Sequence, residues 1–206
     1  MTLELTLVAT SAPMADAFRA HFRAHPAVRV VLGRWEELPY HDCFVTAGNS
    51  YGLMSAGIDA VVVHRFGPDI ERAVQLRIMN EFLGEQPVGS AFILDTGNRQ
   101  VPFLCHAPTM RVPGSIAGTD NVYLATRAAL VAVYHHNRMS DRIIDTVVMP
   151  AFGAGFGGVE PGEVARQMAA AWRLFNEPPY PPDWDRVVAR EQLIVGGGRR
   201  RAKGEA

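Results

Sequence analysis

Short hydrophobic stretches, some of them alternating with polar residues, recur along the chain and predict β-strands. Residues 3–10, LELTLVAT, alternate in the manner of a half-buried strand. Residues 28–33, VRVVLG, and 43–49, CFVTAGN, are rich in β-branched residues, which is typical of strands buried within a sheet. Three further strands are predicted at residues 89–97, 103–109 and 146–152.

Longer segments between these strands show helical spacing. Residues 14–25 repeat large apolar side chains at the period of a helix. A second helix is predicted over about residues 68–83, with proline at its first position. Thr119 is the predicted N-cap of a long helix at residues 120–137. A last helix is predicted at residues 161–175.

Strands that alternate with helices of this length predict an α/β domain, in which helices cover a mainly parallel sheet. Ligands of such domains bind beyond the carboxyl ends of the strands. We therefore expect three loops to meet at one edge of the sheet, at residues 49–59, 109–119 and 153–159.

The composition is that of an ordinary soluble globular protein, with 206 residues, 48% of them hydrophobic and 20% charged. A formal net charge of −1 argues against a generally basic surface for nucleic acid. We expect one domain at residues 1–176. Residues 177–206 read as a stiff Pro-rich connector with a flexible basic tail.

The sequence offers no signal for a membrane span, for secretion or for a metal centre. No apolar run approaches the roughly 20 residues that a span needs. The first ten residues carry acid rather than an Arg-rich leader. Cys43 and Cys105 lie in strand-like runs without the spacing of metal ligands, which argues against structural zinc and against a disulfide framework. A cytoplasmic protein without a cofactor is the expectation.

Two loops of small residues are the candidates for ligand binding. In FGAGFGGVEP, residues 152–161, glycines join a strand to a helix, where backbone N–H groups and the helix start favour an anion. A tight strand-to-helix turn is an equally good reading of this loop alone. The second such loop, at residues 46–59, favours ligand binding over a plain turn. Paired loops of this kind suggest a long ligand with a diphosphate between them.

Two polar residues of the loop at 46–59 have both a functional and a structural interpretation. The amide of Asn49 can donate and accept, as the reading of ribose hydroxyls requires, or it can close an Asx turn at the strand end. Asp59 can act on the ligand, or it can serve as a plain helix N-cap. Spacing alone leaves both alternatives open.

Two segments together resemble the macro domain family. TAGNSYGLMSAGIDAVVVHRFG, residues 46–67, is similar to the first ligand loop of that family, and VVMPAFGAGFGGVEP, residues 147–161, to its phosphate-binding loop. The resemblance covers about residues 3–175. It implies a three-layer α/β/α sandwich with a mixed, mainly parallel central sheet, and a site for ADP-ribose or for an ADP-ribosylated target. Nucleic acid is then expected only as a modified substrate.

The resemblance also implies roles for particular residues. Asn49 is expected at the distal ribose and, with Asp59, at the reaction, while Arg111 on a neighbouring loop is a candidate to pair with a phosphate or a substrate acid. The expected ligand-binding residues are Asn49, Ser50, Gly57, Ile58, Asp59, Arg111, Gly153, Ala154, Gly155, Phe156 and Gly157.

The chain departs from the family where adenine is read. The family has an acid after the second strand, whereas this chain has Arg34 in the segment GRWEE. Glu36, or stacking on Trp35, is the expected substitute. A related nucleotide diphosphate in place of ADP-ribose is the alternative.

The same family contains hydrolases of ADP-ribosyl bonds and readers that only bind. Asp59 coincides with an aspartate that the hydrolases place beside the scissile bond, where a carboxylate stabilises positive charge at the anomeric carbon or orients water. A covalent route through lysine is closed, because Lys203 in the tail is the single lysine. We expect an ADP-ribosyl glycohydrolase-like enzyme, with a non-catalytic reader as the alternative.

Overall fold

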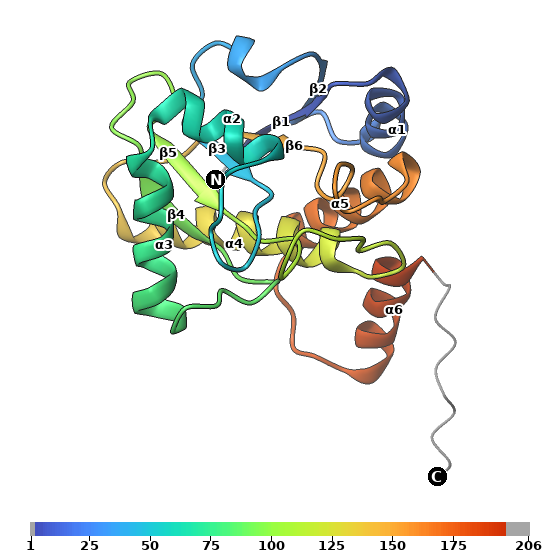
Figure 1. Cartoon of the computed structure of the whole chain (residues 1–206). Coiled ribbons are helices and arrows are strands. Elements are labelled where there is room, and N and C mark those ends of the chain that lie inside the picture. The colour runs from blue at the N-terminus through green and yellow to red at the C-terminus, as the bar shows by residue number, and fades with distance from the viewer. Residues whose placement is uncertain (1–2, 197–206) are drawn as a thin grey trace.

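The structure is a computed structural model that describes residues 3–196 of the chain. Its centre is a six-stranded sheet in the order β2-β1-β6-β3-β5-β4 (Figure 1). β4 runs antiparallel to β5, and the other neighbouring strands are parallel. The strands are β1 (Glu4–Ala9), β2 (Val28–Leu32), β3 (Cys43–Thr46), β4 (Phe92–Asp95), β5 (Phe103–His106) and β6 (Thr146–Pro150).

Helices cover both faces of this sheet (Figure 1). They are α1 (Ala12–Phe22), the short 3-10 helix η1 (Trp35–Glu37), α2 (Gly57–Phe66), α3 (Asp69–Phe82), α4 (Asn121–Met139), α5 (Pro161–Asn176) and α6 (Trp184–Val195). None of the helices in the described part of the chain is long and apolar enough to span a membrane.

Successive residues of the strands enter two different hydrophobic cores. In β3, Cys43 and Val45 pack in one core while Phe44 packs in the other. α1, α4 and α5 complete the first core, and α2 and α3 complete the second. Strands buried on both faces need continuous apolar runs, which is the pattern that the sequence shows. The predicted three-layer α/β/α sandwich with a mixed, mainly parallel sheet is confirmed.

Two details differ from the sequence-based prediction. Residues 89–97 form a strand only at Phe92–Asp95, where the chain pairs antiparallel with β5. Asp120, rather than Thr119, occupies the N-cap of α4, and its side chain makes no capping hydrogen bond. The Thr119 hydroxyl instead donates to the Ile116 carbonyl at 2.7 Å and accepts from the Asn121 N–H at 3.3 Å. Thr119 therefore stabilises the turn that precedes the helix.

The sequence analysis predicted no helix after residue 176, but α6 lies there. Asp183 caps its start by accepting from the Arg186 N–H at 2.9 Å. Ile194 packs in a small third core with residues of α4 and α5. Arg166 of α5 donates to the last carbonyl groups of α6. The helix thus packs on the domain; the expected basic tail falls almost wholly outside the described residues.

Candidate functional site

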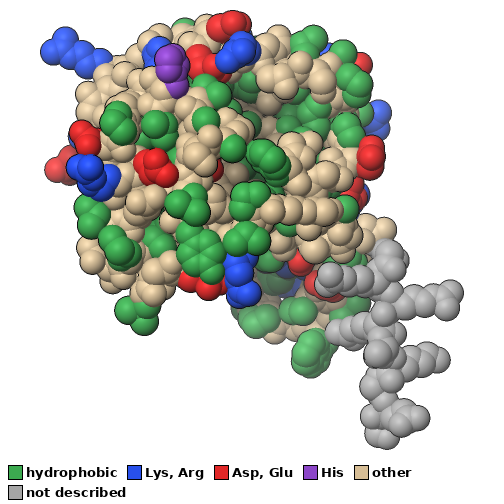
Figure 2. All heavy atoms as spheres, in the orientation of Figure 1, with side chains coloured by type: hydrophobic (Ala, Val, Ile, Leu, Met, Phe, Trp, Pro, Cys, Tyr) green, Lys and Arg blue, Asp and Glu red, His purple; other side chains and the backbone are tan. Residues whose placement is uncertain are grey.

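A groove crosses the carboxyl ends of β1, β3 and β6, where the two small-residue loops meet. It consists of a first hollow of about 470 Å³ between β1, α1 and residues 34–36, and a second hollow of about 270 Å³ beside residues 47–59. The space-filling view shows a depression in the middle of this face with hydrophobic side chains around it (Figure 2). The hollows share the lining residues Gly57, Ile58, Pro150, Ala151 and Gly155.

The loop after β6 offers free backbone donors at the junction of the hollows. A Cβ on Gly157 would lie 2.5 Å from the carbonyl oxygen of Gly153, so this tight turn requires glycine. In residues 3–196, the N–H groups of Gly155, Phe156 and Gly157 donate to no acceptor. Three successive free N–H groups between a strand and a helix are suited to bind an anion.

The side chain of Asn49 shapes its own loop. Its amide oxygen accepts from the N–H groups of Tyr51 at 3.1 Å and Leu53 at 3.3 Å, and its amide nitrogen donates to the Leu53 carbonyl at 2.7 Å. The Asx-turn alternative therefore holds, although Asn49 also lines the second hollow. Ser50 is buried and does not line either hollow; its N–H donates to the Met110 carbonyl at 3.0 Å.

Asp59 lies in the wall of the second hollow and is not a helix cap. It is the third residue of α2, whose N-cap is Ala56, so the N-cap alternative is wrong. Its carboxylate is 6% exposed and accepts a short hydrogen bond from the Thr46 hydroxyl. Burial raises the pKa of Asp59 to about 6; the hydrogen bond from Thr46 opposes the rise and the charge of Glu71 adds to it.

Thr46 and Glu71 are site residues that the sequence analysis missed. Thr46 ends β3 and precedes Asp59 by thirteen residues. Glu71 of α3 accepts from the N–H of Met54 at 2.9 Å and so holds the loop against α3. No local pattern marks either residue, because each becomes important only through a contact between separate elements.

Arg111 is not brought into the groove. Its guanidinium is paired with Glu85 at 2.7 Å, and the other carboxylate oxygen of Glu85 accepts from the Tyr51 hydroxyl at 3.1 Å. The arginine side chain is 71% exposed and lines neither hollow. Arg111 therefore lies outside the two hollows, and its ion pair with Glu85 ties loops together. A contact between Arg111 and a phosphate stays a prediction.

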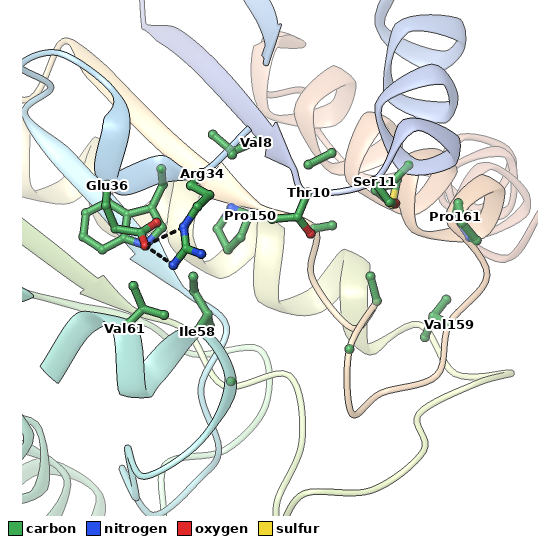
Figure 3. A pocket seen from close by; sticks show the side chains of 17 residues that line it. Val8, Thr10, Ser11, Arg34, Glu36, Ile58, Val61, Pro150, Val159 and Pro161 are labelled. Atoms are coloured by element: carbon green, nitrogen blue, oxygen red, sulfur yellow. Dashed lines mark hydrogen bonds and ion pairs between the residues drawn. The ribbon is translucent and has the colours of Figure 1, made fainter. Parts of the chain in front are cut away.

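A charged pair closes one end of the first hollow (Figure 3). The Arg34 guanidinium donates to one carboxylate oxygen of Glu36 from two nitrogens, at 2.8 and 3.2 Å. Burial raises the pKa of Glu36, but hydrogen bonding and the charge of Arg34 outweigh it and leave the pKa below its ordinary value. Arg34 contacts only one of the two carboxylate oxygens of Glu36.

Trp35 cannot offer a stacking surface, as the sequence analysis had suggested. Its side chain is 2% exposed, and its indole ring stacks on Phe44 with 4.0 Å between ring centroids. The ring belongs to the core beneath the first hollow. Arg34 and Glu36 therefore supply the charged side chains at this end of the first hollow.

A buried polar pair supports the floor of the second hollow. The His106 ring bonds to the Gln86 amide oxygen at 2.7 Å, and a Cβ on Gly48 would lie 2.3 Å from its other ring nitrogen. Burial lowers the pKa of His106 to about 4, so the ring is neutral at physiological pH. His106 packs beneath the loop at residues 46–59. No group of three or more His, Cys, Asp or Glu residues within residues 3–196 could hold a metal ion.

Comparisons with known proteins agree with this geometry. The chain matches the macro domain family over residues 45–168. An uncharacterized protein of Aquifex aeolicus is 34% identical over 151 residues, covering 72% of this chain and 82% of that protein. An uncharacterized protein of Aeropyrum pernix is 34% identical over 163 residues, covering 79% of this chain and 75% of that protein.

Solved structures share the fold at lower identity. The macrodomain of Mycobacterium tuberculosis DarG is 22% identical with a TM-score of 0.54, covering 74% of this chain and 96% of that one. The Oceanobacillus iheyensis macrodomain with ADP is 22% identical with a TM-score of 0.53, covering 66% of this chain and 71% of that one. A mutant of the latter with ADPR has a TM-score of 0.54 at 22% identity, covering 67% and 73%. From the match over most of its fold, the chain belongs to the macro domain family.

Proposed function

We propose that the groove binds ADP-ribose and that the protein hydrolyses ADP-ribosyl linkages. The observation that carries the binding proposal is the position of three free N–H groups, at residues 155–157, where two hollows join. A diphosphate at that junction would leave a nucleoside on one side and a second ribose on the other. The solved macrodomains with ADP and with ADPR support this ligand.

The shape of the groove suggests which end holds which part of the ligand. The first hollow is the larger, is bounded by aliphatic side chains and has the Arg34–Glu36 pair at its edge, so we place the nucleoside there. The second hollow is lined by Asn49 and Asp59, so the distal ribose belongs there. This orientation puts the only buried carboxylate of the groove beside the anomeric carbon.

Asp59 supplies the chemistry of the proposed reaction. Cleavage at an anomeric carbon builds positive charge, which a carboxylate stabilises, and the incoming water needs a base to accept its proton. A general base works best when its pKa lies near the operating pH, and burial has raised the pKa of Asp59 to about 6. The Thr46 hydroxyl fixes one carboxylate oxygen and leaves the other for water.

A reader module that binds without turnover is the second candidate. It is favoured by Asn49, whose amide is engaged by its own loop rather than turned toward the hollow. In that case Asn49 and Asp59 hold the shape of the loop and of the ribose pocket. Binding would be the same in both cases, and turnover would separate them.

The test of the binding proposal is a calorimetric titration of the chain with ADP-ribose, ADP and AMP. Gly155→Glu places a bulky anion at the junction, where a Cβ meets no other atom within 4 Å, so the fold should tolerate it. We expect affinity for ADP-ribose to fall by about 100-fold or more, since the new carboxylate repels the diphosphate.

Gly162→Glu is the matched control, because it adds the same charge at an open position of α5 that lines neither hollow. Its affinity should stay within about threefold of the parent. Equal binding by the parent and Gly155→Glu would refute the phosphate assignment.

A further inference from the structure

A second cavity lies away from the groove, between the domain and its C-terminal helix. It has a volume of about 440 Å³ and is bounded by α4, the end of α5, the Pro-rich connector after residue 176 and α6. Figure 1 shows the connector leaving α5 and looping out before α6 returns. This α6 cavity shares no lining residue with either hollow of the groove. Its volume is within the usual range for small-molecule sites, roughly 300–1,000 Å³.

Two arginines from different helices line this cavity. Arg127 comes from α4 and Arg190 from α6, and both are partly buried. Burial lowers the pKa of Arg127, and the charge of Arg190 lowers it further against the opposing effect of Tyr123. Burial lowers the pKa of Arg190 as well, but hydrogen bonds to Tyr123 and Tyr180 outweigh it and leave that pKa raised. Both guanidinium groups are therefore charged, and an anion bound between them would be attracted by both.

No acidic side chain of the described residues neutralises this pair. Neighbouring arginines have acidic partners: Arg173 pairs with Glu177 at 3.1 Å, and Arg186 pairs with Asp183 at 3.1 Å. Among the described residues, Glu177 is the only acid that lines the cavity, and it is already paired with Arg173. In residues 3–196, neither Arg127 nor Arg190 forms such an ion pair, although Arg190 donates hydrogen bonds to the hydroxyl groups of Tyr123 and Tyr180. The two positive charges therefore have no carboxylate beside them.

Most of the remaining wall is apolar or aromatic, and His135 and Glu177 are its other polar residues. Arg186 lies over the Tyr180 ring at 4.9 Å from its centroid and holds that ring in place. A Pro-rich connector keeps its shape better than a glycine-rich one would. The apolar and aromatic lining residues are Val131, Tyr134, Leu174, Phe175, Pro178, Pro179, Tyr180, Pro182 and Val187.

We propose that the α6 cavity binds a small organic anion, with its carboxylate or phosphate between Arg127 and Arg190 and a flat apolar body against the wall. The two guanidinium groups supply charge-assisted hydrogen bonds, for which arginine is well suited. The aromatic and proline side chains supply apolar surface for the body of the ligand. Because α6 carries Arg190, a bound ligand joins α6 to α4. This site is separate from the groove and does not depend on the proposed hydrolase activity.

The experiment is a titration of the full chain with four probes: phenyl phosphate, benzoate, inorganic phosphate and benzyl alcohol. At least one of the two organic anions should bind at least tenfold more tightly than benzyl alcohol, which lacks charge, and than inorganic phosphate, which lacks the apolar body. Benzoate and phenyl phosphate distinguish the two acid groups. If neither organic anion exceeds both simple probes, the proposal is wrong.

Variants then locate the binding. Arg127→Gln and Arg190→Gln should each weaken the anion at least tenfold, and Arg72→Gln, which removes a 77% exposed arginine of α3, should not. Circular dichroism measures whether each variant keeps its helices. If Arg190→Gln loses α6, the affinity of Arg127→Gln for the anion decides whether the proposal holds. The Gly155→Glu chain should bind the probe as the parent does. Loss of binding in that chain would place the anion in the groove and overturn the proposal, as would unchanged binding by Arg127→Gln.

Hydrogen exchange provides a readout that does not depend on affinity. The amides of α6 should exchange more slowly in the presence of the bound anion, because Arg190 then holds the helix to α4. Unchanged exchange in α6 at saturating probe would contradict the proposed position.

Discussion

The two hollows of the groove share their middle but differ in how they hold charge. In the first hollow, the carboxylate of Glu36 is ionised and paired with Arg34 at the edge, where the arginine side chain is 63% exposed. In the second hollow, Asp59 is buried, has a raised pKa and has only a hydroxyl as its partner. A paired carboxylate is suited to recognition, whereas an unpaired buried one is suited to proton transfer. Under the proposed function, selectivity and chemistry would therefore lie at opposite ends of one site.

The largest effect on turnover is expected for Asp59→Asn, which removes the carboxylate of the second hollow. If Asp59 acts mainly in the transition state, turnover should fall by about 100-fold or more while affinity for ADP-ribose stays within about tenfold. The assay measures release of ADP-ribose from a panel of modified proteins and nucleic acids. Asp69→Asn, at a 91% exposed aspartate of α3, is the control and should keep full turnover. If Asp59→Asn is fully active, or the parent releases nothing from any acceptor, the reader alternative prevails.

Stability provides an independent check on the same variant. The pKa of Asp59 is raised in the folded chain from an ordinary 3.8 to about 6, so its ionisation opposes folding. Above that pH, Asp59→Asn should be more stable than the parent by up to about 3 kcal/mol. This gain in stability should diminish as pH falls through 6. It should vanish below about pH 4, where Asp59 is protonated in both the folded and the unfolded parent chain. Thermal unfolding across this range measures it, and a destabilised variant at pH 8 would argue for a structural role.

The pH dependence of turnover is a further test of the difference between the two hollows, with a moderate expected effect. If ionised Asp59 is the base, turnover should follow a group with a pKa of about 6 and fall about tenfold between pH 7 and pH 5. Thr46→Val removes the hydrogen bond that favours the ionised form, so the acid limb should move to higher pH by about one unit. Glu36→Gln removes a carboxylate from the first hollow and should leave the limb unchanged. If the acid limb moves in Glu36→Gln but not in Thr46→Val, the general base lies in the first hollow and the assignment to Asp59 is wrong.

The smallest expected effect concerns recognition of the adenine ring. The carboxylate oxygen of Glu36 that Arg34 does not contact can accept from the exocyclic amine of adenine, which inosine lacks. ADP-ribose should therefore bind more tightly than its inosine counterpart by severalfold to about tenfold. Glu36→Gln should reduce that preference, and Glu37→Gln, its neighbour in η1, should not. Titrations with both nucleotides measure the ratio. A preference that persists in Glu36→Gln would show that another group reads the base.

The fold and the position of the groove follow from local features of the sequence. Alternating apolar residues in strands such as CFVT determine which core each side chain enters, and the two small-residue loops mark the carboxyl ends of β3 and β6. These features act over a few residues, so a linear pattern can carry them. The glycines at 153 and 157 likewise reflect a local requirement for close backbone approach.

The properties that separate the two hollows were decided by contacts between distant residues. The sequence alone leaves Asp59 two interpretations, of which a plain helix N-cap is the commoner. The structure excludes the cap, because Ala56 occupies the N-cap of α2 and Asp59 is buried against the hydroxyl of Thr46. Arg111 looked free to bind a phosphate until the fold placed Glu85 beside it. Trp35 looked able to stack on a base until Phe44 covered its ring. Burial and charge pairing depend on which elements pack together, and therefore only the tertiary structure fixes the pKa and the accessibility of each candidate residue.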